Sequence, residues 1–127
     1  MRPKKKILLL ATGIHAEILR FTLETRGHYR VALGLDGEDA LLLLRHGKYD
    51  ALLAEVAGQD ETANDLARQA KQLDGHIGTV LFSRSISDYQ RGCHADHFIP
   101  EILCNSEVIL NRVGLATARK RGPKVSA

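Results

Sequence analysis

The sequence predicts an α/β fold in which a five-stranded parallel sheet is covered by helices on both faces. Two observations lead to this prediction. Short apolar runs without polar alternation recur along the chain, a pattern typical of strands buried on both faces. The segments between these runs carry apolar residues near helical spacing and are bounded by glycines or capping residues. Strands and helices that alternate in this way form βαβ units.

The first half of the chain supplies three strands and two helices. Asp36 can cap the second helix, with Asp39 three residues later in an imperfect capping box. Gly27 and Gly47 are stop signals for the two helices. The apolar residues of the first helix are Ile18, Leu19, Phe21 and Leu23. The expected elements are the strand 7–10, the helix 15–26, a weaker strand 29–35, a helix between Asp36 and Gly47, and the strand 49–56.

The second half supplies two strands, two helices and a segment, 84–95, that fits either a short helix or an irregular turn. Asn105 or Ser106 caps the last helix, and Gly122-Pro123 ends it. The side chains expected to face inward are Leu66, Ala67, Ala70 and Leu73 in one helix, and Val108, Ile109, Val113 and Ala116 in the other. The expected elements are the polar loop 57–61, the helix 62–73, the turn 74–76, and the strands 77–82 and 97–99.

Length and cysteine content indicate one domain in a reducing compartment. A chain of 127 residues can bury a sufficient core without a disulfide or a metal. Cys93 and Cys104 do not make a secreted disulfide framework, so we expect a cytoplasmic protein. The basic start before 7–10 imitates a signal peptide, but its apolar run is too short and we expect no membrane span. We expect residues 1–118 to form the domain and 119–127 a basic tail.

Charge argues against a broad nucleic-acid-binding face. The formal net charge is +3, but eight of the 18 Lys and Arg residues lie in the two ends of the chain. Residues 7–118 then hold ten basic residues against all 15 acidic ones. Nucleic-acid binding needs clustered basic residues across the fold, so contact through the tails is the only such possibility.

Five stretches in a fixed order carry a resemblance to a known family. They are Lys5-Lys6-Ile7-Leu8-Leu9-Leu10, Gly27-His28-Tyr29, Asp36-Gly37-Glu38-Asp39-Ala40-Leu41, Tyr49-Asp50-Ala51-Leu52-Leu53 and Ala95-Asp96-His97-Phe98-Ile99. Over about residues 4–118 the sequence resembles a response-regulator receiver domain. The resemblance implies the flavodoxin-like, doubly wound (βα)5 fold and two-component signal transduction. The stretch between Ser83 and Glu101 is short, so we expect a reduced fourth helix.

The resemblance also shows where this chain departs from the family. The positions of the family's Mg²⁺-binding acidic pair are occupied by Ala11 and Thr12, and the phosphate-accepting aspartate by Glu55. Ser83 matches the family's Ser or Thr after the fourth strand, whereas Glu101, after Pro100, replaces the lysine that pairs with the phosphoryl group. Magnesium is held by carboxylates, and phosphoryl transfer relies on the metal and on cations. We therefore expect no Mg²⁺ or other cofactor, no phosphoacceptor chemistry and no enzyme activity in this degenerate pocket.

Two interpretations of Glu55 remain open. Its longer carboxylate could imitate the phosphorylated state by bonding Ser83, or the pocket could have decayed so that Glu55 points to water. If Glu55 and Glu101 approach each other, Arg84 is the nearest candidate for a cation between them.

Two other groupings of reactive residues lack the spacing of a site. Cys93-His94-Ala95-Asp96-His97 with Cys104 contains zinc ligand types but matches no paired-ligand pattern, so we expect no metal. Ser83 has no Gly-x-Ser-x-Gly elbow around it, which argues against a hydrolase.

The function expected from the resemblance is a stand-alone pseudo-receiver that binds a protein partner without aspartyl phosphorylation. We expect no output domain after the receiver-like region, so the partner would be a histidine kinase or an output protein. The contact surface, or a homodimer interface, would be the face of the fourth helix, fifth strand and fifth helix. Its residues would be Tyr89, Phe98, Ile102 and the outer side of 106–118. The alternative is a residual phosphotransfer receiver that uses Ser83 or another acceptor such as Asp60.

Overall fold

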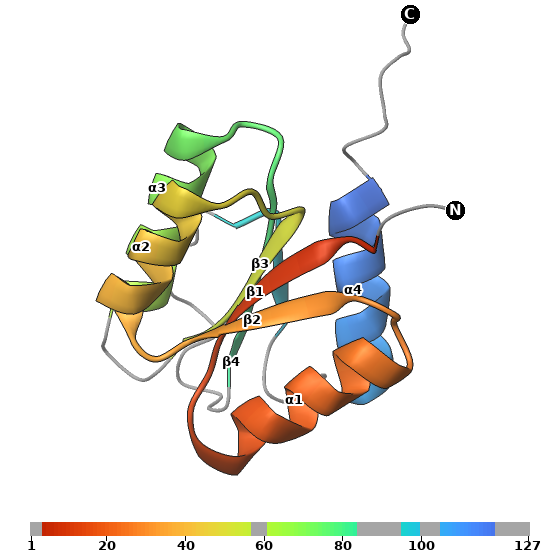
Figure 1. The fold of residues 1–127 in the computed structure, drawn as a ribbon. Helices are drawn as coiled ribbons and strands as arrows, with labels where there is room; N and C mark the ends of the chain where they lie inside the picture. Colours follow the sequence, from red (N-terminus) through yellow and green to blue (C-terminus); the bar gives the residue numbers. More distant parts are fainter. Residues whose placement is uncertain (1–3, 57–60, 84–94, 100–104, 119–127) are drawn as a thin grey trace, which may run out of the picture.

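The computed structural model places a five-stranded sheet at the centre of the molecule (Figure 1). It describes residues 4–56, 61–83, 95–99 and 105–118. The strand order is β2-β1-β3-β4-β5, and every neighbouring pair is parallel. The strands are β1 Lys6–Leu10, β2 Arg30–Gly34, β3 Ala51–Val56, β4 Gly78–Ser83 and β5 His97–Ile99. The helices in the described residues are α1 Gly13–Thr25, α2 Gly37–His46, α3 Thr62–Leu73 and α4 Ser106–Ala118.

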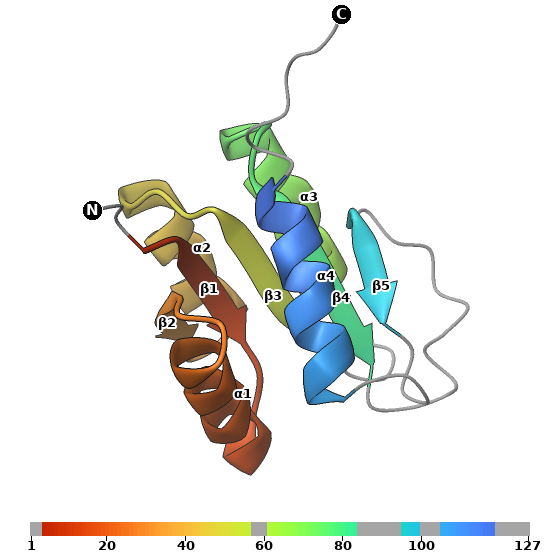
Figure 2. The same ribbon diagram turned by 90° about the vertical axis from the view of Figure 1, so that its right-hand side faces the viewer.

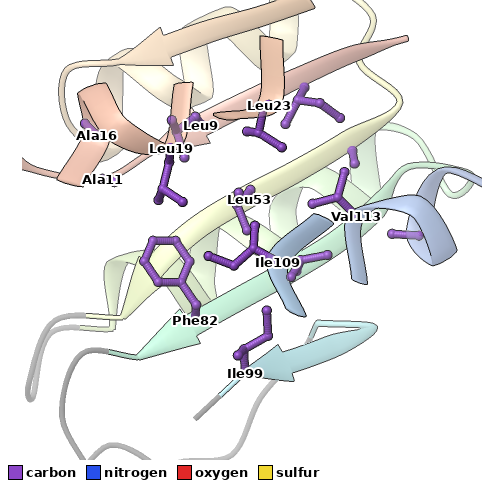
Figure 3. Close-up of a cluster of buried hydrophobic side chains, with 14 residues drawn as sticks. Leu9, Ala11, Ala16, Leu19, Leu23, Leu53, Phe82, Ile99, Ile109 and Val113 are labelled. Carbon is purple, nitrogen blue, oxygen red and sulfur yellow. The ribbon is translucent and has the colours of Figure 1, made fainter. Parts of the chain in front are cut away.

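The helices form one layer on each side of the sheet (Figures 1 and 2). Helices α1 and α4 cover one face, and α2 and α3 cover the other. Alternate side chains of a strand point to opposite faces, so Leu9 and Leu53 pack under α1 and α4, while Leu8 and Leu52 pack under α2 and α3. Figure 3 shows the first of these cores, in which Leu23, Phe82 and Val113 meet Leu9 and Leu53 over the sheet. The predicted doubly wound fold is confirmed.

The central strands are buried on both faces, as their apolar runs predicted. Five of the six residues of β3 and all six of β4 are buried. Strand β2 lies at the edge of the sheet and is more exposed, in agreement with its weaker sequence pattern. The turn at 74–76 is also present, because Asp74 accepts a hydrogen bond from the amide of His76.

Helix ends follow the predicted caps. The Asp36 carboxylate accepts a hydrogen bond from Asp39 N at 2.8 Å, and the Asp39 carboxylate accepts one from Leu35 N at 2.8 Å. Asn105, rather than Ser106, caps α4, since its side-chain oxygen accepts from the amide of Val108 at 3.0 Å. Helix α4 runs from Ser106 to Ala118, and the expected stop at Gly122-Pro123 lies outside the described residues.

One expectation about inward-facing side chains was wrong, that for Leu73 of α3, and two apolar side chains of α1 are exposed as well. Ile18 and Phe21 of α1 are 52% and 68% exposed, so Ala16 and Thr22 join Leu19 and Leu23 on its buried side. Leu73 of α3 is 51% exposed, and the inner face of that helix instead begins with Ala63. Leu73 shares a face with Leu66 and Ala70 but is the last residue of α3, whereas α1 carries apolar residues on more than one side.

Strand β5 is short and is attached to β4 by a polar cluster. The Asp96 carboxylate accepts from Thr79 N at 3.0 Å and lies 2.9 Å from Lys71 Nζ, and Asp96 N donates to the Thr79 hydroxyl at 2.9 Å. Lys71 also donates to the carbonyl of Ile77. The Lys71 and Asp96 side chains are 28% and 13% exposed, so this pair is largely shielded from water. We call Lys71, Thr79 and Asp96 the β5 latch.

Candidate functional site

The predicted pocket lies where β1, β3 and β4 reach their carboxyl ends, the edge at which ligands bind in doubly wound folds. Parallel pairing aligns Leu10 with Ala54, Glu55 with Phe82, and Val56 with Ser83. The two residues that follow β1 differ in exposure. Ala11 is buried, whereas Thr12 is exposed at the start of α1. Ala11, Thr12, Glu55 and Ser83 are therefore brought to one edge of the sheet, as their positions in the sequence predicted.

Glu55 makes a contact that neither of its two interpretations included. Its Oε1 accepts a hydrogen bond from the backbone N–H of Thr12, with a donor–acceptor distance of 3.2 Å. The Thr12 hydroxyl lies 3.5 Å from the same oxygen, at the limit of a hydrogen bond. The half-buried carboxylate is thus held against the β1–α1 turn by the residue that follows buried Ala11. It does not simply point to water.

This arrangement offers a divalent cation few ligands. Magnesium prefers octahedral oxygen coordination that includes one or two carboxylates. Glu55 supplies one carboxylate, Thr12 contributes a hydrogen-bond donor toward it, and Ala11 has no side-chain oxygen. Among the described residues, no group of three or more His, Cys, Asp or Glu side chains could hold a metal ion.

Ser83 is fully buried at the end of β4. Its hydroxyl is therefore shielded from a phosphate donor in solution. Phe98 of β5 is half-buried and packs against the core beneath α2 and α3, next to the β5 latch. Ser83 lies in β4, which has a neighbouring strand on each side, whereas Phe98 lies in β5 at the edge of the sheet. This difference explains why Ser83 is the more deeply buried of the two.

Several predicted residues cannot be compared with the structure. Glu101, Arg84, Asp60, Tyr89 and Ile102 lie outside the described residues. So do the fourth helical segment, the cysteines of the rejected zinc grouping and the basic tail. The predictions made for these residues stay predictions.

The structure reveals an exposed apolar stripe on α1 that the sequence interpretation missed. Ile14, Ile18 and Phe21 are 71%, 52% and 68% exposed, and they lie at positions i, i+4 and i+7 of one helix. This spacing places the three side chains on one face. We call Ile14, Ile18 and Phe21 the α1 stripe. A helical projection of residues 13–25 would have separated it from Ala16, Leu19 and Leu23, and contiguous exposed apolar surface is a mark of interaction sites.

Comparison with solved structures identifies the fold. A response-regulator receiver domain from Methanospirillum hungatei JF-1 is similar to this chain, with 16% sequence identity and a TM-score of 0.77. The alignment covers 94% of this chain and 98% of the Methanospirillum chain. The receiver domain of a signal transduction histidine kinase from Syntrophus aciditrophicus matches 97% of this chain over 98% of its own, with 24% identity and a TM-score of 0.77. This chain therefore has the flavodoxin-like fold of CheY-like receiver domains.

A third similar structure has a different biological role. It represents a family of redox sensors in the streptococci that evolved from two-component response regulators. The match has 23% identity and a TM-score of 0.72, and it covers 92% of this chain but 52% of the streptococcal one. No protein-family model matches this sequence, and no curated protein does. None of the helices in the described part of the chain has the length and hydrophobicity to span a bilayer.

Proposed function

We propose that this chain is a pseudo-receiver of two-component signal transduction, which binds a protein partner without being phosphorylated on an aspartate. The hydrogen bond between Thr12 N and Glu55 Oε1 carries this proposal. The position that accepts phosphate in receivers holds a glutamate, and its carboxylate is bonded to the turn that would otherwise help to hold Mg²⁺. Without a second carboxylate at Ala11 or Thr12, the metal needed for phosphoryl transfer has too few ligands.

The α1 stripe supports the partner-binding part of the proposal. Ile14, Ile18 and Phe21 form a continuous apolar row on a helix whose other side is packed on the core. The face expected from the resemblance is less apolar among the described residues, because Phe98 is half-buried and Leu115 is the one strongly exposed large apolar side chain of α4. We therefore propose that the partner binds the α1 stripe, and the β5–α4 face is the second candidate surface.

The streptococcal redox sensors evolved from response regulators, so proteins of that descent can have a role other than that of a response regulator. This supports the proposal that a receiver fold can act without phosphorylation. The alternative of residual phosphotransfer through Ser83 has less support, because that hydroxyl is fully buried.

The first experiment tests whether the phosphorylation switch is absent. The full chain is titrated with Mg²⁺, then with beryllofluoride and with acetyl phosphate, and followed by amide NMR shifts and intact mass. We expect no saturable shift at Thr12, Glu55 or Ser83 and no phosphoryl adduct. A triple variant, Ala11→Asp with Thr12→Asp and Glu55→Asp, is the matched control and should gain Mg²⁺ binding. A stable acyl phosphate on the native chain would overturn the proposal.

The second experiment tests the partner surface. Proteins captured from a host extract by the native chain are compared by quantitative mass spectrometry with those captured by Phe21→Ser and by Leu115→Ser. Both substitutions remove an exposed apolar side chain, so both variants should fold. We expect a partner that is lost with Phe21→Ser and kept with Leu115→Ser. Capture that is the same for all three chains would exclude the α1 stripe.

A further inference from the structure

A cavity of about 430 Å³ lies between the carboxyl-terminal ends of α2 and α3. It opens at the amino-terminal end of the sheet, where Tyr49 and Ile77 precede β3 and β4, and so it is remote from Glu55 at the other end. Small-molecule sites typically measure about 300–1,000 Å³. The apolar part of its lining is formed by Leu44, Ala70, Leu73 and Ile77. The size and lining fit the apolar body of a small organic molecule.

Tyr49 supplies a hydrogen-bonding group to this cavity. Its side chain is 7% exposed, with its ring beneath the Lys6 ammonium at 4.9 Å from the ring centroid. No protein group within the described residues is a hydrogen-bond partner of its hydroxyl. The hydroxyl is not among the fully buried polar atoms that lack a partner, so it keeps contact with solvent, and Tyr49 is one of the residues that line the cavity. Burial raises the pKa of the Tyr49 phenol, so that it keeps its proton at neutral pH and can donate.

The rim of the cavity is positively charged. Arg45 and Lys48 line it, and neither forms an ion pair in the described part of the chain. His46 lines the same side. The Asp74 carboxylate also lines the cavity, but it already accepts a hydrogen bond from the amide of His76. The two cations near the end of α2 also suit the negative end of its helix dipole, so their presence alone does not indicate a ligand. Together with the phenol of Tyr49, which can donate a hydrogen bond to a ligand, they favour an anion at the mouth.

We propose that this cavity binds a small amphipathic anion, a compact aromatic or branched apolar group that carries one carboxylate. The apolar body lies on Leu73 and Ile77, the carboxylate faces Arg45 and Lys48, and the Tyr49 hydroxyl donates one hydrogen bond to the ligand. This inference goes beyond the partner-binding function and does not rest on it.

The test compares two probes of similar shape and opposite charge, naphthalene-2-carboxylate and 2-naphthylmethylamine. Amide NMR shifts of the full chain are followed during titration with each probe. We expect saturable binding of the carboxylate, with shifts at Gly47, Tyr49 and Ile77 and none at Thr12 or Glu55. The amine should bind at least tenfold more weakly. Equal binding of both probes, or carboxylate shifts elsewhere, would overturn the proposal.

Three variants assign the contacts. Tyr49→Phe keeps the ring and removes only the hydroxyl, and should weaken carboxylate binding about three- to tenfold, the effect of one hydrogen bond. Arg45→Glu with Lys48→Glu should weaken it more than tenfold and improve amine binding. Arg20→Glu changes the same kind of charge on α1 and should change neither. An unchanged affinity in the Arg45/Lys48 variant would refute the charge argument even if the cavity binds naphthalene.

Discussion

Substitution of Asp96 by alanine tests the polar contact that attaches β5 to β4. The change removes the acceptor of Thr79 N at 3.0 Å and the partner of Lys71 Nζ at 2.9 Å. Thr79 is fully buried, so water does not easily replace the lost acceptor. We expect the variant to be less stable and β5 to be the first element that separates from the sheet.

The size of this effect can be estimated from the contacts. A hydrogen bond to a charged group contributes about 1.5–3 kcal/mol. Breaking a fully buried ion pair costs about 3–5 kcal/mol, but Lys71 is 28% exposed and can turn toward water, so we assign roughly 1 kcal/mol to it. The total is about 3 kcal/mol, a large part of the roughly 5–15 kcal/mol that stabilises a typical domain.

The assay is equilibrium unfolding in urea, followed by circular dichroism, for the native chain, Asp96→Ala, Asp96→Asn and Asp65→Ala. Asp65 forms an exposed i,i+3 pair with Arg68 and is the matched control, with an expected loss below about 0.5 kcal/mol. Asp96→Asn keeps an acceptor for Thr79 N and should lie between the two. If Asp96→Ala is no less stable than Asp65→Ala, the β5 latch does not act as described.

Three further predictions concern stability. Gly78→Ala would place its Cβ 2.6 Å from the Cβ of Ala116 and 2.7 Å from its carbonyl oxygen, so β4 and α4 must separate, and we expect a loss of about 1–3 kcal/mol in urea unfolding. Asp36→Ala removes the cap of α2 and should cost about 0.5–2 kcal/mol, measured by thermal unfolding, whereas Asp36→Asn should cost less. The pKa of Tyr49 is raised above 10.0 in the fold, so its contribution to stability is present below pH 10 and is lost as the pH rises through the folded pKa. Tyr49→Phe should reduce that alkaline loss in unfolding curves, and an unchanged pH profile would contradict the assignment.

The strands could be predicted from the sequence because their physical signals are local, and the flavodoxin-like arrangement was implied by the resemblance. The apolar runs at 7–10 and 51–54 have no polar interruption, and the caps at Asp36 and Asn105 satisfy amide groups within three residues. The gathering of Ala11, Thr12, Glu55 and Ser83 followed from parallel pairing, which brings the carboxyl ends of strands to one edge.

Contacts between distant side chains could not be predicted in the same way. The bond from Thr12 to Glu55 depends on the rotamer of one glutamate and on the path of the β1–α1 turn, which begins α1 at Gly13 with a φ of 62°. The β5 latch joins Lys71 of a helix to Asp96, 25 positions later. The exposed α1 stripe was overlooked because the apolar residues of this helix were not assigned to its faces, although much of any protein surface is apolar.

The division of the core by the sheet has a consequence for how substitutions combine. Leu8 and Leu9 are neighbours in sequence, yet their side chains belong to two separate packing environments. A change of volume beneath α3 can relax among its own neighbours without displacing the side chains beneath α1. Losses of stability from one substitution in each environment should therefore sum, whereas two in the same environment should not. Pairwise stability measurements on a library of core variants would then divide the core residues into two groups. Each group would contain the side chains that share one face of the sheet.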